Sequence, residues 1–452
     1  MGVMTLSPFT IDLYDKGLTW IGSIGNPITV RGSVVYNGVS NFTIEVGSDD
    51  RLVPDLVEYG ARITMTYKDV PLFSGMITGV TGSLLTNGSV FVDVVSDWRM
   101  LENTLAIIRP SNQIEATTIS VSGQSHVTDQ AQAWLPGGAA TQGTSGTTIG
   151  QVGYYQWDAA VNYSETALKT IISENALTRL GRPLTLATDL ERGGDIRAAG
   201  LLPVARMTRL DEVCTEILGF SNLGLTLQQT PRATTITVDV FEPGVYEAPL
   251  TVASEIVVGG SWSIQAPAIT RAILGGGGEL ADRQFVNYTD GSAEIENTWG
   301  DVVEIFREAT SGAQLIYPET APYDEKRVPK YYELRTDVTA LQKAAYRRAL
   351  NVAGARALSE GTNRFGLTAE LSETEAFTFG GANGIQLGDQ VTIASERGTL
   401  YTDRITECSF DFGDNVFQVT PIVGKRLDDP NVQLANAIVA LARSQRRIST
   451  DR

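Results

Sequence analysis

The sequence has 452 residues, with 52 Asp and Glu against 35 Lys and Arg, which gives a formal net charge of −17. This length allows several hydrophobic cores, and a hydrophobic content of 42% is ordinary for a folded chain. The acidic balance disfavours a surface that neutralises nucleic-acid phosphates, and a single histidine excludes a histidine cluster for catalysis or metal binding.

The two cysteines and the N-terminal residues indicate in which kind of cellular compartment the protein folds. Cys214 and Cys408 lie far apart and neither belongs to a CxxC pair, which predicts buried thiols, not a disulfide framework or a zinc site. The N-terminal residues do not resemble a signal peptide, and no apolar run reaches the ~20 residues of a membrane span. These features favour synthesis and folding in a reducing, aqueous compartment.

Residues 1–105 carry short runs of alternating apolar and polar positions between turn residues, the pattern of β-strands. Asn37-Gly38 separates two such runs and predicts a type I′ hairpin, whose two central residues both take positive φ. A second strand pair covers 63–77, and Asn87-Gly88 then turns the chain into another strand. We therefore expect an N-terminal antiparallel β-barrel domain here.

The next segment differs in composition. Residues 137–150 are almost entirely Gly, Thr, Ser, Gln and Ala, which is typical of a flexible excursion. An amphipathic helix is predicted over 164–180, with Ser164 as its N-cap and Gly181 in its stop signal. We interpret residues 106–200 as an inserted domain.

A second helix is predicted over 208–218, with Cys214 on its apolar face and Gly219 at its end. Strands at 224–228 and 235–240 follow it, so residues 201–335 are expected to form a second β domain.

The remaining chain is expected to hold two helices and another β unit. One helix, capped by Asp337, covers 337–360, and with the strands after it makes a unit of residues 336–428. Those strands are predicted at 366–370, 390–394, 402–407 and 416–420. Residues 429–452 are expected to form a C-terminal helix with a basic tail.

The whole pattern predicts an α+β fold that is mainly β. We expect several small antiparallel β barrels or sandwiches with a few amphipathic helices and a C-terminal helix. No internal repeat is clear enough in the sequence to assign.

The usual catalytic motifs are missing from the sequence. There is no GxxxxGK[ST] phosphate loop, no HExxH and no GxSxG motif. Ser125 beside His126 is better explained as a loop or strand position, because adjacent residues seldom form a nucleophile and its base. The glycine run 275–278 lacks GxGxxG spacing and precedes an acidic residue, which favours a tight turn.

Carboxylate pairs remain as candidates for glycosidase chemistry. Glu294 with Glu296 is one such pair, but among 52 acidic residues chance pairs are common, and a solvated strand face or helix turn explains it better. Asp411 and Asp414 suggest a cation loop, although a hairpin turn accounts for them. We assign no catalytic residue, no cofactor and no metal, and predict that the chain is not an enzyme.

Four segments, in their order and spacing, carry a family resemblance. They are Asn41–Ile77, then Leu210–Leu225 with Thr270–Glu279, and finally Leu387–Gly424. The chain resembles the tail hub proteins of long-tailed bacteriophages, often labelled minor tail proteins in phages of actinobacteria. No segment of residues 106–200 contributes to the resemblance.

The resemblance implies a structural virion protein at the tip of the tail, made in the cytoplasm of the host bacterium. Such a hub continues or closes the tail tube, between a distal tail or tube protein above and tip or fibre proteins below. Hubs of this family are homotrimers with two similar barrels per chain that imitate a hexameric tube ring. DNA passes through the lumen without sequence-specific binding, and acidic walls suit that role because like charges keep DNA sliding.

Two alternatives stay open. A virion-associated cell-wall glycosidase would use carboxylates alone, and a receptor-binding or glycan-binding tail module would use the tryptophans and the inserted domain.

The C-terminal helix is the candidate interface. Leu434, Leu441 and Ile448 are seven residues apart and Ile438 lies on the same side, which suits pairing with symmetry mates or docking on another tail protein. Arg443, Arg446 and Arg447 place cations at its C-terminal end, where the helix dipole favours them and an acidic neighbour would find a contact.

Overall fold

The computed structural model describes residues 7–424 except for a set of gaps. These are 83–87, 107–117, 122–123, 128–139, 143–147, 151–154, 157–162, 195–203, 206–207, 265, 276–284, 309–353, 355–356, 359–364, 375–376, 382–383, 396–397 and 414–415. The expected mainly β fold with antiparallel sheets and few helices is confirmed. Among the described residues, no helix is both long and apolar enough to cross a membrane.

The chain divides into two compact units. Unit 1 holds residues 1–99, 224–265 and 364–452, and unit 2 holds 100–223 and 266–363. Each unit thus draws on segments far apart in the sequence. The division into five domains predicted from the sequence stays a prediction, as do the helix over 337–360, which lies almost wholly outside the described residues, and the C-terminal helix, which lies outside them.

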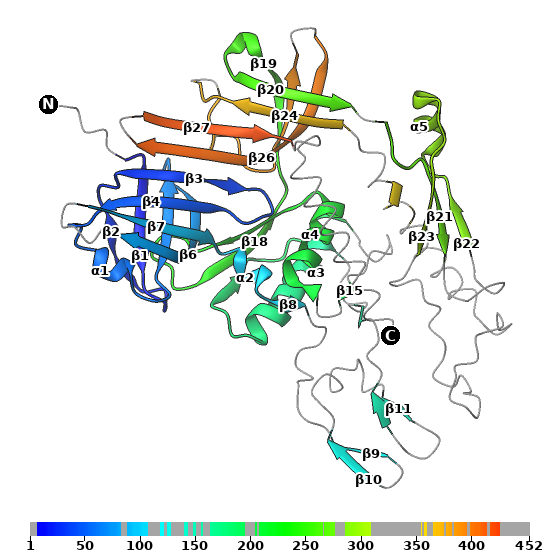
Figure 1. The fold of residues 1–452 in the computed structure, drawn as a ribbon, viewed down its shortest axis with the longest axis horizontal. Helices are drawn as coiled ribbons and strands as arrows, with labels where there is room; N and C mark the ends of the chain where they lie inside the picture. The colour runs from blue at the N-terminus through cyan, green and yellow to red at the C-terminus, as the bar shows by residue number, and fades with distance from the viewer. Residues whose placement is uncertain are drawn as a thin grey trace. The chain divides into compact units, whose positions relative to one another are not determined.

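Unit 1 consists almost entirely of strands (Figure 1). Its elements are β1 Phe9–Tyr14, β2 Trp20–Ile24, β3 Thr29–Val35, β4 Asn41–Gly47, α1 Val53–Leu56, β5 Arg62–Tyr67, β6 Val70–Gly82, β7 Ser89–Ser96, β17 Gly224–Gln228, β18 Ile236–Phe241, β19 Val245–Thr251, β20 Val257–Ile264, β24 Phe365–Leu371, β25 Gln390–Ala394, β26 Leu400–Gly413 and β27 Val416–Val423.

Unit 2 carries the longer helices and several short strand pairs. Its elements are α2 Arg99–Glu102 at the boundary, β8 Leu105–Ala106, β9 Thr118–Val121, β10 Gln124–Val127, β11 Ala140–Gln142, β12 Thr148–Gly150, β13 Tyr155–Gln156, α3 Ser164–Ile172, a π-helical turn Ser173–Thr178, β14 Leu184–Leu186, β15 Val204–Ala205, β16 Thr208–Arg209, α4 Leu210–Ser221, β21 Arg271–Gly275, β22 Phe285–Tyr288, α5 Ser292–Trp299 and β23 Glu304–Glu308.

The main sheet of unit 1 contains the same five-stranded module twice. Its strand order runs β2-β1-β5-β6-β7-β4-β3-β26-β27-β24-β20, with β25 pairing β26. The first module has the order β5-β6-β7-β4-β3, and the second has the order β25-β26-β27-β24-β20. The sequence alone showed no repeat that could be assigned, so the duplication is a finding of the structure.

The first two strands of the modules match in register over residues 62–65 and 73–76; beyond Met65 the β5–β6 ladder shifts, whereas the β25–β26 ladder does not. Within β5–β6, Ile63 pairs with Gly75 and Met65 with Phe73; within β25–β26, Val391 pairs with Asp403 and Ile393 with Tyr401. Each residue of the second hairpin is numbered 328 higher than its counterpart. Gly60 and Gly388, which precede the two hairpins, both have positive φ, 84° and 87°.

The ladder between the second and third strands repeats a β-bulge as well, with the extra residue on the second strand. The ladder between β6 and β7 shifts register at Thr78, and the ladder between β26 and β27 shifts at Thr406. In both places the threonine hydroxyl donates a hydrogen bond across the ladder, from Thr78 to the carbonyl of Asp93 and from Thr406 to the carbonyl of Ile422. A shared irregularity of this kind marks the two modules as copies of one design.

The fourth and fifth strands share a close backbone approach. Gly32 on β3 lies opposite Phe42 on β4, and Gly260 on β20 lies opposite Ala369 on β24. A Cβ on Gly32 would lie 2.7 Å from the Cα of Phe42, and one on Gly260 would lie 3.1 Å from the Cα of Ala369. Both positions therefore require glycine for the same reason.

The predicted type I′ turn at Asn37-Gly38 is wrong. Asn37 has φ 50°, but Gly38 does not share the left-handed conformation, and β4 begins only at Asn41. The Asn37 side-chain oxygen accepts a hydrogen bond from the Leu225 amide at 2.9 Å, which holds a wider loop against β17. A two-residue turn with two positive φ values lies instead at Lys68-Asp69, between β5 and β6.

Two helix predictions need correction at their ends. Ser164 is the first residue of α3, and the cap position is Tyr163, whose backbone is extended. The Ser164 hydroxyl does not cap the helix but donates to the Gly193 carbonyl at 2.8 Å. The predicted single helix also changes to a π-helical turn at Ser173. Helix α4 continues past Gly219 to Ser221 and ends at Asn222, which has a left-handed φ of 58°.

Candidate functional site

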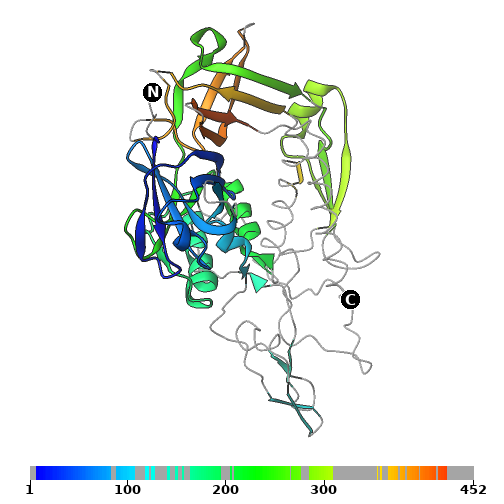
Figure 2. The ribbon, with the colours of Figure 1, turned by 60° about the vertical axis from the view of Figure 1, so that its left-hand side comes forward.

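The contact between the two modules is the most distinctive feature of unit 1. Strand β26 is long enough to pair with β25 through its first residues and with β3 through its later ones. Because β27 occupies the opposite edge of β26, β3 extends the edge that β25 leaves open. We call this β3–β26 pairing the joint; β3 and β26 lie side by side in Figure 1 and Figure 2.

The inner side of the joint belongs to one hydrophobic core shared by both modules. Phe410 on β26 is 2% exposed, and its ring lies 6.0 Å from that of Phe42 and 5.5 Å from that of Tyr67. Val34 and Cys408, which pair across the joint, are also buried. Burial of this aromatic cluster supplies most of the attraction between the modules.

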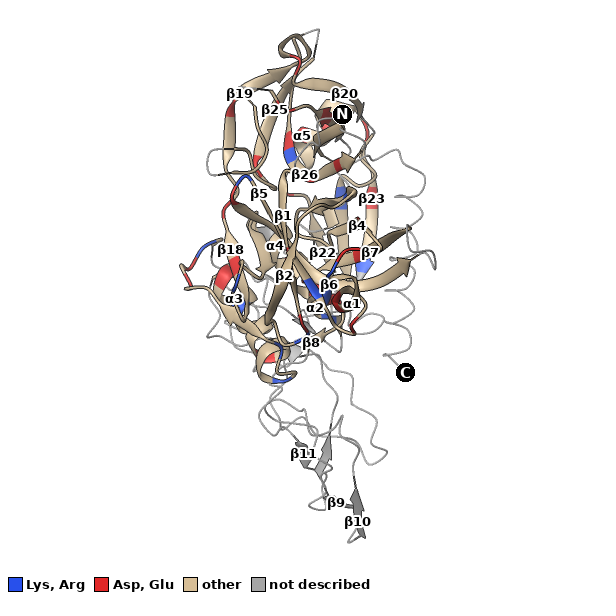
Figure 3. Cartoon of the chain, turned by 90° about the vertical axis from the view of Figure 1, so that its left-hand side faces the viewer, with Lys and Arg blue, Asp and Glu red and all other residues tan. Residues whose placement is uncertain are grey.

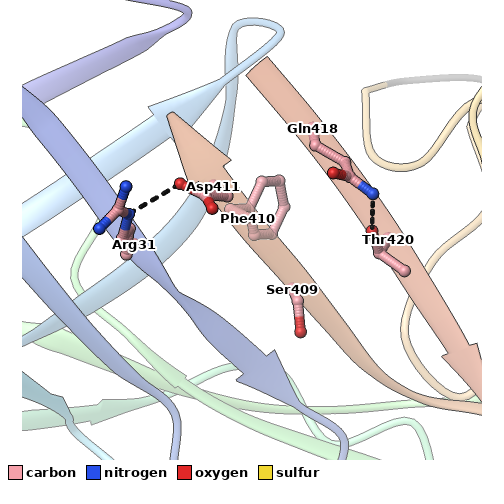
Figure 4. A pocket seen from close by; sticks show the side chains of 6 residues that line it. All are labelled: Arg31, Ser409, Phe410, Asp411, Gln418 and Thr420. Carbon is pink, nitrogen blue, oxygen red and sulfur yellow. Dashed lines mark hydrogen bonds and ion pairs between the residues drawn. The ribbon is translucent and has the colours of Figure 1, made fainter. Parts of the chain in front are cut away.

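The outer side of the joint is polar and shallow. Arg31 on β3 and Asp411 on β26 form an ion pair at 2.9 Å with both side chains more than half exposed. Beside it lies a hollow of about 320 Å³, drawn in Figure 4, with Ser409, Phe410, Gln418 and Thr420 as its other lining residues. Hydroxyls, an amide and a self-neutralising ion pair offer hydrogen bonds but no nucleophile with an adjacent base.

A second contact fastens the modules beside the core. The carboxylate of Glu373 accepts hydrogen bonds from the Tyr67 hydroxyl at 3.2 Å and from the Lys68 ammonium at 2.8 Å. Lys68 also donates to the Phe379 carbonyl, and the Phe379 amide donates to Glu373. Burial and the neighbouring Glu373 carboxylate raise the pKa of Tyr67, so its hydroxyl stays a donor.

A buried polar network ties hairpin β17–β18 to the first module. Arg62 and Asp97 form a buried ion pair, and the Ser74 hydroxyl donates to Asp97 at 2.6 Å. The backbone amide of Gln229 donates to the Ser74 hydroxyl at 2.8 Å. Close by, the Arg232 guanidinium lies 3.4 Å from the ring centroid of Trp20. These contacts explain why Arg62, a charged residue, is tolerated inside the fold.

The carboxylate pair considered for glycosidase chemistry does not form an acid and base pair. Glu294 and Glu296 are two residues apart on α5, so they point to different sides of the helix. Glu296 accepts hydrogen bonds from Arg271 at 2.6 and 2.8 Å, and these bonds lower its pKa. A glycosidase general acid needs a raised pKa, so Glu296 is unsuited to that role.

The other candidate residues lie in β-strands or are buried in the core. His126 lies in strand β10, opposite Ile119, and Asp411 lies in the β26–β27 hairpin. Cys214 and Cys408 are fully buried free thiols whose pKa values burial raises, so neither is poised as a thiolate. Within the described residues, no cluster of three or more His, Cys, Asp or Glu is placed to hold a metal ion.

The interface residues predicted from the sequence stay a prediction. Leu434, Ile438, Leu441, Ile448, Arg443, Arg446 and Arg447 all lie outside the described residues. The joint was not predicted from the sequence, and its partners, such as Arg31 and Asp411, lie about 380 residues apart. The one available signal was the similarity of residues 60–78 to residues 388–406. The same residue type recurs 328 positions later for Gly60, Thr64, Leu72, Ile77 and Thr78.

Comparison with known proteins identifies the family. Residues 153–425 match the model of the Siphovirus ReqiPepy6 Gp37-like protein family. The chain belongs to this Gp37-like family. Because it is a family of siphovirus tail proteins, the chain is a structural protein of a phage tail, and the resemblance found in the sequence is confirmed. No curated protein sequence matches the chain.

Several solved structures are similar to this Gp37-like protein. A 43 kDa tail protein of prophage MuSo2 from Shewanella oneidensis has 10% identity and a TM-score of 0.49, covering 92% of this chain and 98% of its own. Prophage tail protein gp18 from Listeria monocytogenes has 9% identity and a TM-score of 0.49, covering 96% and 99%. A tail protein from Neisseria meningitidis has 10% identity and a TM-score of 0.47, covering 93% and 97%.

Proposed function

We propose that this Gp37-like protein is the hub of the tail tip, a homotrimer that continues or closes the tail tube. The observation that supports the proposal is the duplicated five-stranded module. Three chains that each supply two equivalent modules present six equivalent positions, which matches a sixfold tube while using threefold symmetry. The hub joins a distal tail or tube protein above to tip or fibre proteins below.

The lumen of this ring would carry the DNA during ejection. A net charge of −17 favours passage over binding, since an acidic wall repels the phosphate backbone at short range. The protein is therefore expected to show no sequence-specific binding to DNA.

We also propose that the protein has no enzymatic activity of its own. The carboxylate pair is divided between two sides of α5, and both thiols are buried with raised pKa values. The Glu296→Gln and Glu294→Gln variants should leave any peptidoglycan-degrading activity of intact particles unchanged in zymography. Loss of a lytic band in either variant, with normal assembly, would show chemistry at this site.

The C-terminal segment is the proposed contact with another tail protein. Its apolar residues Leu434, Leu441 and Ile448, followed by the arginines at 443, 446 and 447, suit an acidic partner with an apolar groove. Deletion after Asp428 should leave the isolated protein folded but give particles without the tip components. Truncated particles with a complete tip would refute the interface role.

The oligomeric state tests the hub proposal. Light scattering or native mass spectrometry of purified protein over a range of concentrations should give a mass of three chains. A stable monomer at the highest concentration, or a ring of six chains, would contradict the proposal.

A further inference from the structure

The two modules differ in which of their corresponding strand edges are paired with another strand. In the joint, β3 of the first module covers the later residues of β26 in the second module. The counterpart of β3 is β20, and the counterpart of the later part of β26 is residues 79–82 of β6. Within the described residues, β20 pairs only with β24, and residues 79–82 pair only with β7. One chain therefore makes the module contact once and presents both halves of a second one.

We propose that β20 of one chain pairs with β6 of a neighbouring copy, in the register that β3 and β26 already show within the chain. This inference rests on the proposed ring and names its subunit contact. In the joint, Ser33 lies opposite Ser409 and Val34 opposite Cys408. Transferred to the counterparts, Ser261 lies opposite Thr81 of the neighbouring copy, and Trp262 opposite its Val80.

The sequence of β20 fits a covered strand. Val257–Ile264 holds eight residues without a charge or a proline, so the strand carries neither blue nor red in Figure 3. Edge strands that stay in solvent are normally protected by charged residues, proline or bulges that twist the edge away. The one irregularity of β20 lies at its start, between Val257 and Gly259, and leaves the rest of the edge open to a partner.

Trp262 shows what a neighbouring copy would cover. Its counterpart in the first module, Val34, pairs with Cys408 in the joint and is 3% exposed, whereas Trp262 is 55% exposed although it stacks on Tyr401. Burying the remaining indole surface against Val80 of a neighbour would add apolar contact at the place where the joint has Val34 against Cys408.

The contact is head-to-tail, because β20 and β6 are different strands. Such contacts close into a ring or extend into an open filament, depending on the rotation between successive copies. The alternative, β20 of one chain against β20 of another, would be a two-fold contact and would stop at a dimer.

Disulfide trapping distinguishes these arrangements. A chain carrying both Thr81→Cys and Ser261→Cys should, on mild oxidation, lose its monomer band on a non-reducing gel and form a ladder ending at three chains, which dithiothreitol reverses. Opposed residues in an antiparallel ladder lie within disulfide reach. The native Cys214 and Cys408 do not interfere, because both are buried.

Three controls fix the register and the orientation. Neither single variant should cross-link alone, whereas a mixture of the two should give dimers; cross-linking of Ser261→Cys alone would indicate the two-fold contact and overturn the proposal. Phe91→Cys with Ser261→Cys should also fail to cross-link, because Phe91 lies opposite Thr81 but one strand farther from the edge.

The outcomes separate this inference from the hub proposal. A trimer by light scattering without cross-linking of the double variant would refute the strand pairing and leave the trimer standing. A ladder that continues past three chains would support the pairing and refute the trimer. A monomer without cross-links would refute both.

Discussion

Gly388 and Gly60 occupy equivalent left-handed positions before the two hairpins. A Cβ at Gly388 would clash with the Tyr36 ring, whereas one at Gly60 would lie 3.0 Å from the Cβ of Lys16. We expect Gly60→Ala to cost about 1–2 kcal/mol of unfolding free energy through its positive φ, and Gly388→Ala to cost more.

Denaturant unfolding of both variants checks this order. The matched control is Gly219→Ala on α4, where a Cβ meets nothing within 4 Å. This substitution should be neutral or stabilise by about 0.5–1 kcal/mol, because alanine is the better helix former. Equal losses at Gly388 and Gly219 would show that neither the positive φ nor the Tyr36 ring makes glycine necessary at position 388.

Glu165 on α3 is the best-defined buried charge of unit 2. Its side chain is fully buried and accepts hydrogen bonds from Lys169 at 2.6 Å and from the Arg192 guanidinium at 2.8 and 3.0 Å. Burial raises the pKa of Glu165, but the bonds from Arg192 and Lys169 outweigh it and lower the pKa to about 2.

The lowered pKa fixes the sign of the pH dependence. A carboxylate with a lower pKa in the folded state stabilises the fold fully above its ordinary value of 4.5, and this stabilisation is lost as the pH falls towards 2. Glu165→Gln should cost roughly 3–5 kcal/mol at pH 7, because it removes the buried carboxylate to which Lys169 and Arg192 both donate. The loss should shrink on acidification; a pH-independent loss would show that packing, not charge, is responsible.

At the scale of elements, the joint is held by its core more than by its surface. Phe410→Ala should destabilise unit 1 by about 3–5 kcal/mol, because it empties the centre of the aromatic cluster. A double-mutant cycle of Arg31→Ala and Asp411→Ala should give a coupling below about 1 kcal/mol, since both side chains are more than half exposed. Thermal unfolding of these variants measures both, and a coupling as large as the Phe410 loss would reverse the assignment.

Most strands of unit 1 were predictable because each carries its own local pattern. The alternation at 390–394 predicted β25 with its observed bounds, and Cys214 was correctly placed on the buried face of α4. The turn at Asn37-Gly38 failed because a contact with Leu225, which lies far along the sequence, overrides local turn preference. Lys68-Asp69 carries no Gly or Asn, so sequence preference could not reveal its turn type.

The duplication and the joint were not predictable from local pattern. The modules share few identical residues, and residues 266–363 of unit 2 lie between β20 and β24, so the second copy is interrupted. Strand pairing between β3 and β26 depends on shape and burial and leaves little trace in composition. The candidate site therefore came from the structure, whereas the family came from the order of short segments.

At the scale of the whole molecule, assembly should depend on the uncharged edge of β20. Ser261→Lys places a charge on that edge, the usual natural means of preventing strand addition. The variant should stay folded as a monomer, with one cooperative thermal transition, but lose the trimer in light scattering. Asn41→Lys, at an exposed position on interior strand β4, is the matched control and should leave assembly unchanged.

The central claim is that two modules per chain in three chains build one sixfold-like ring on the tail axis. An image reconstruction of the tail end of the intact particle tests it most directly. We expect three copies of this protein, with their six modules arranged around an open axial channel in a continuous sheet. Six copies in the ring, or modules that lie away from the axis, would contradict the account.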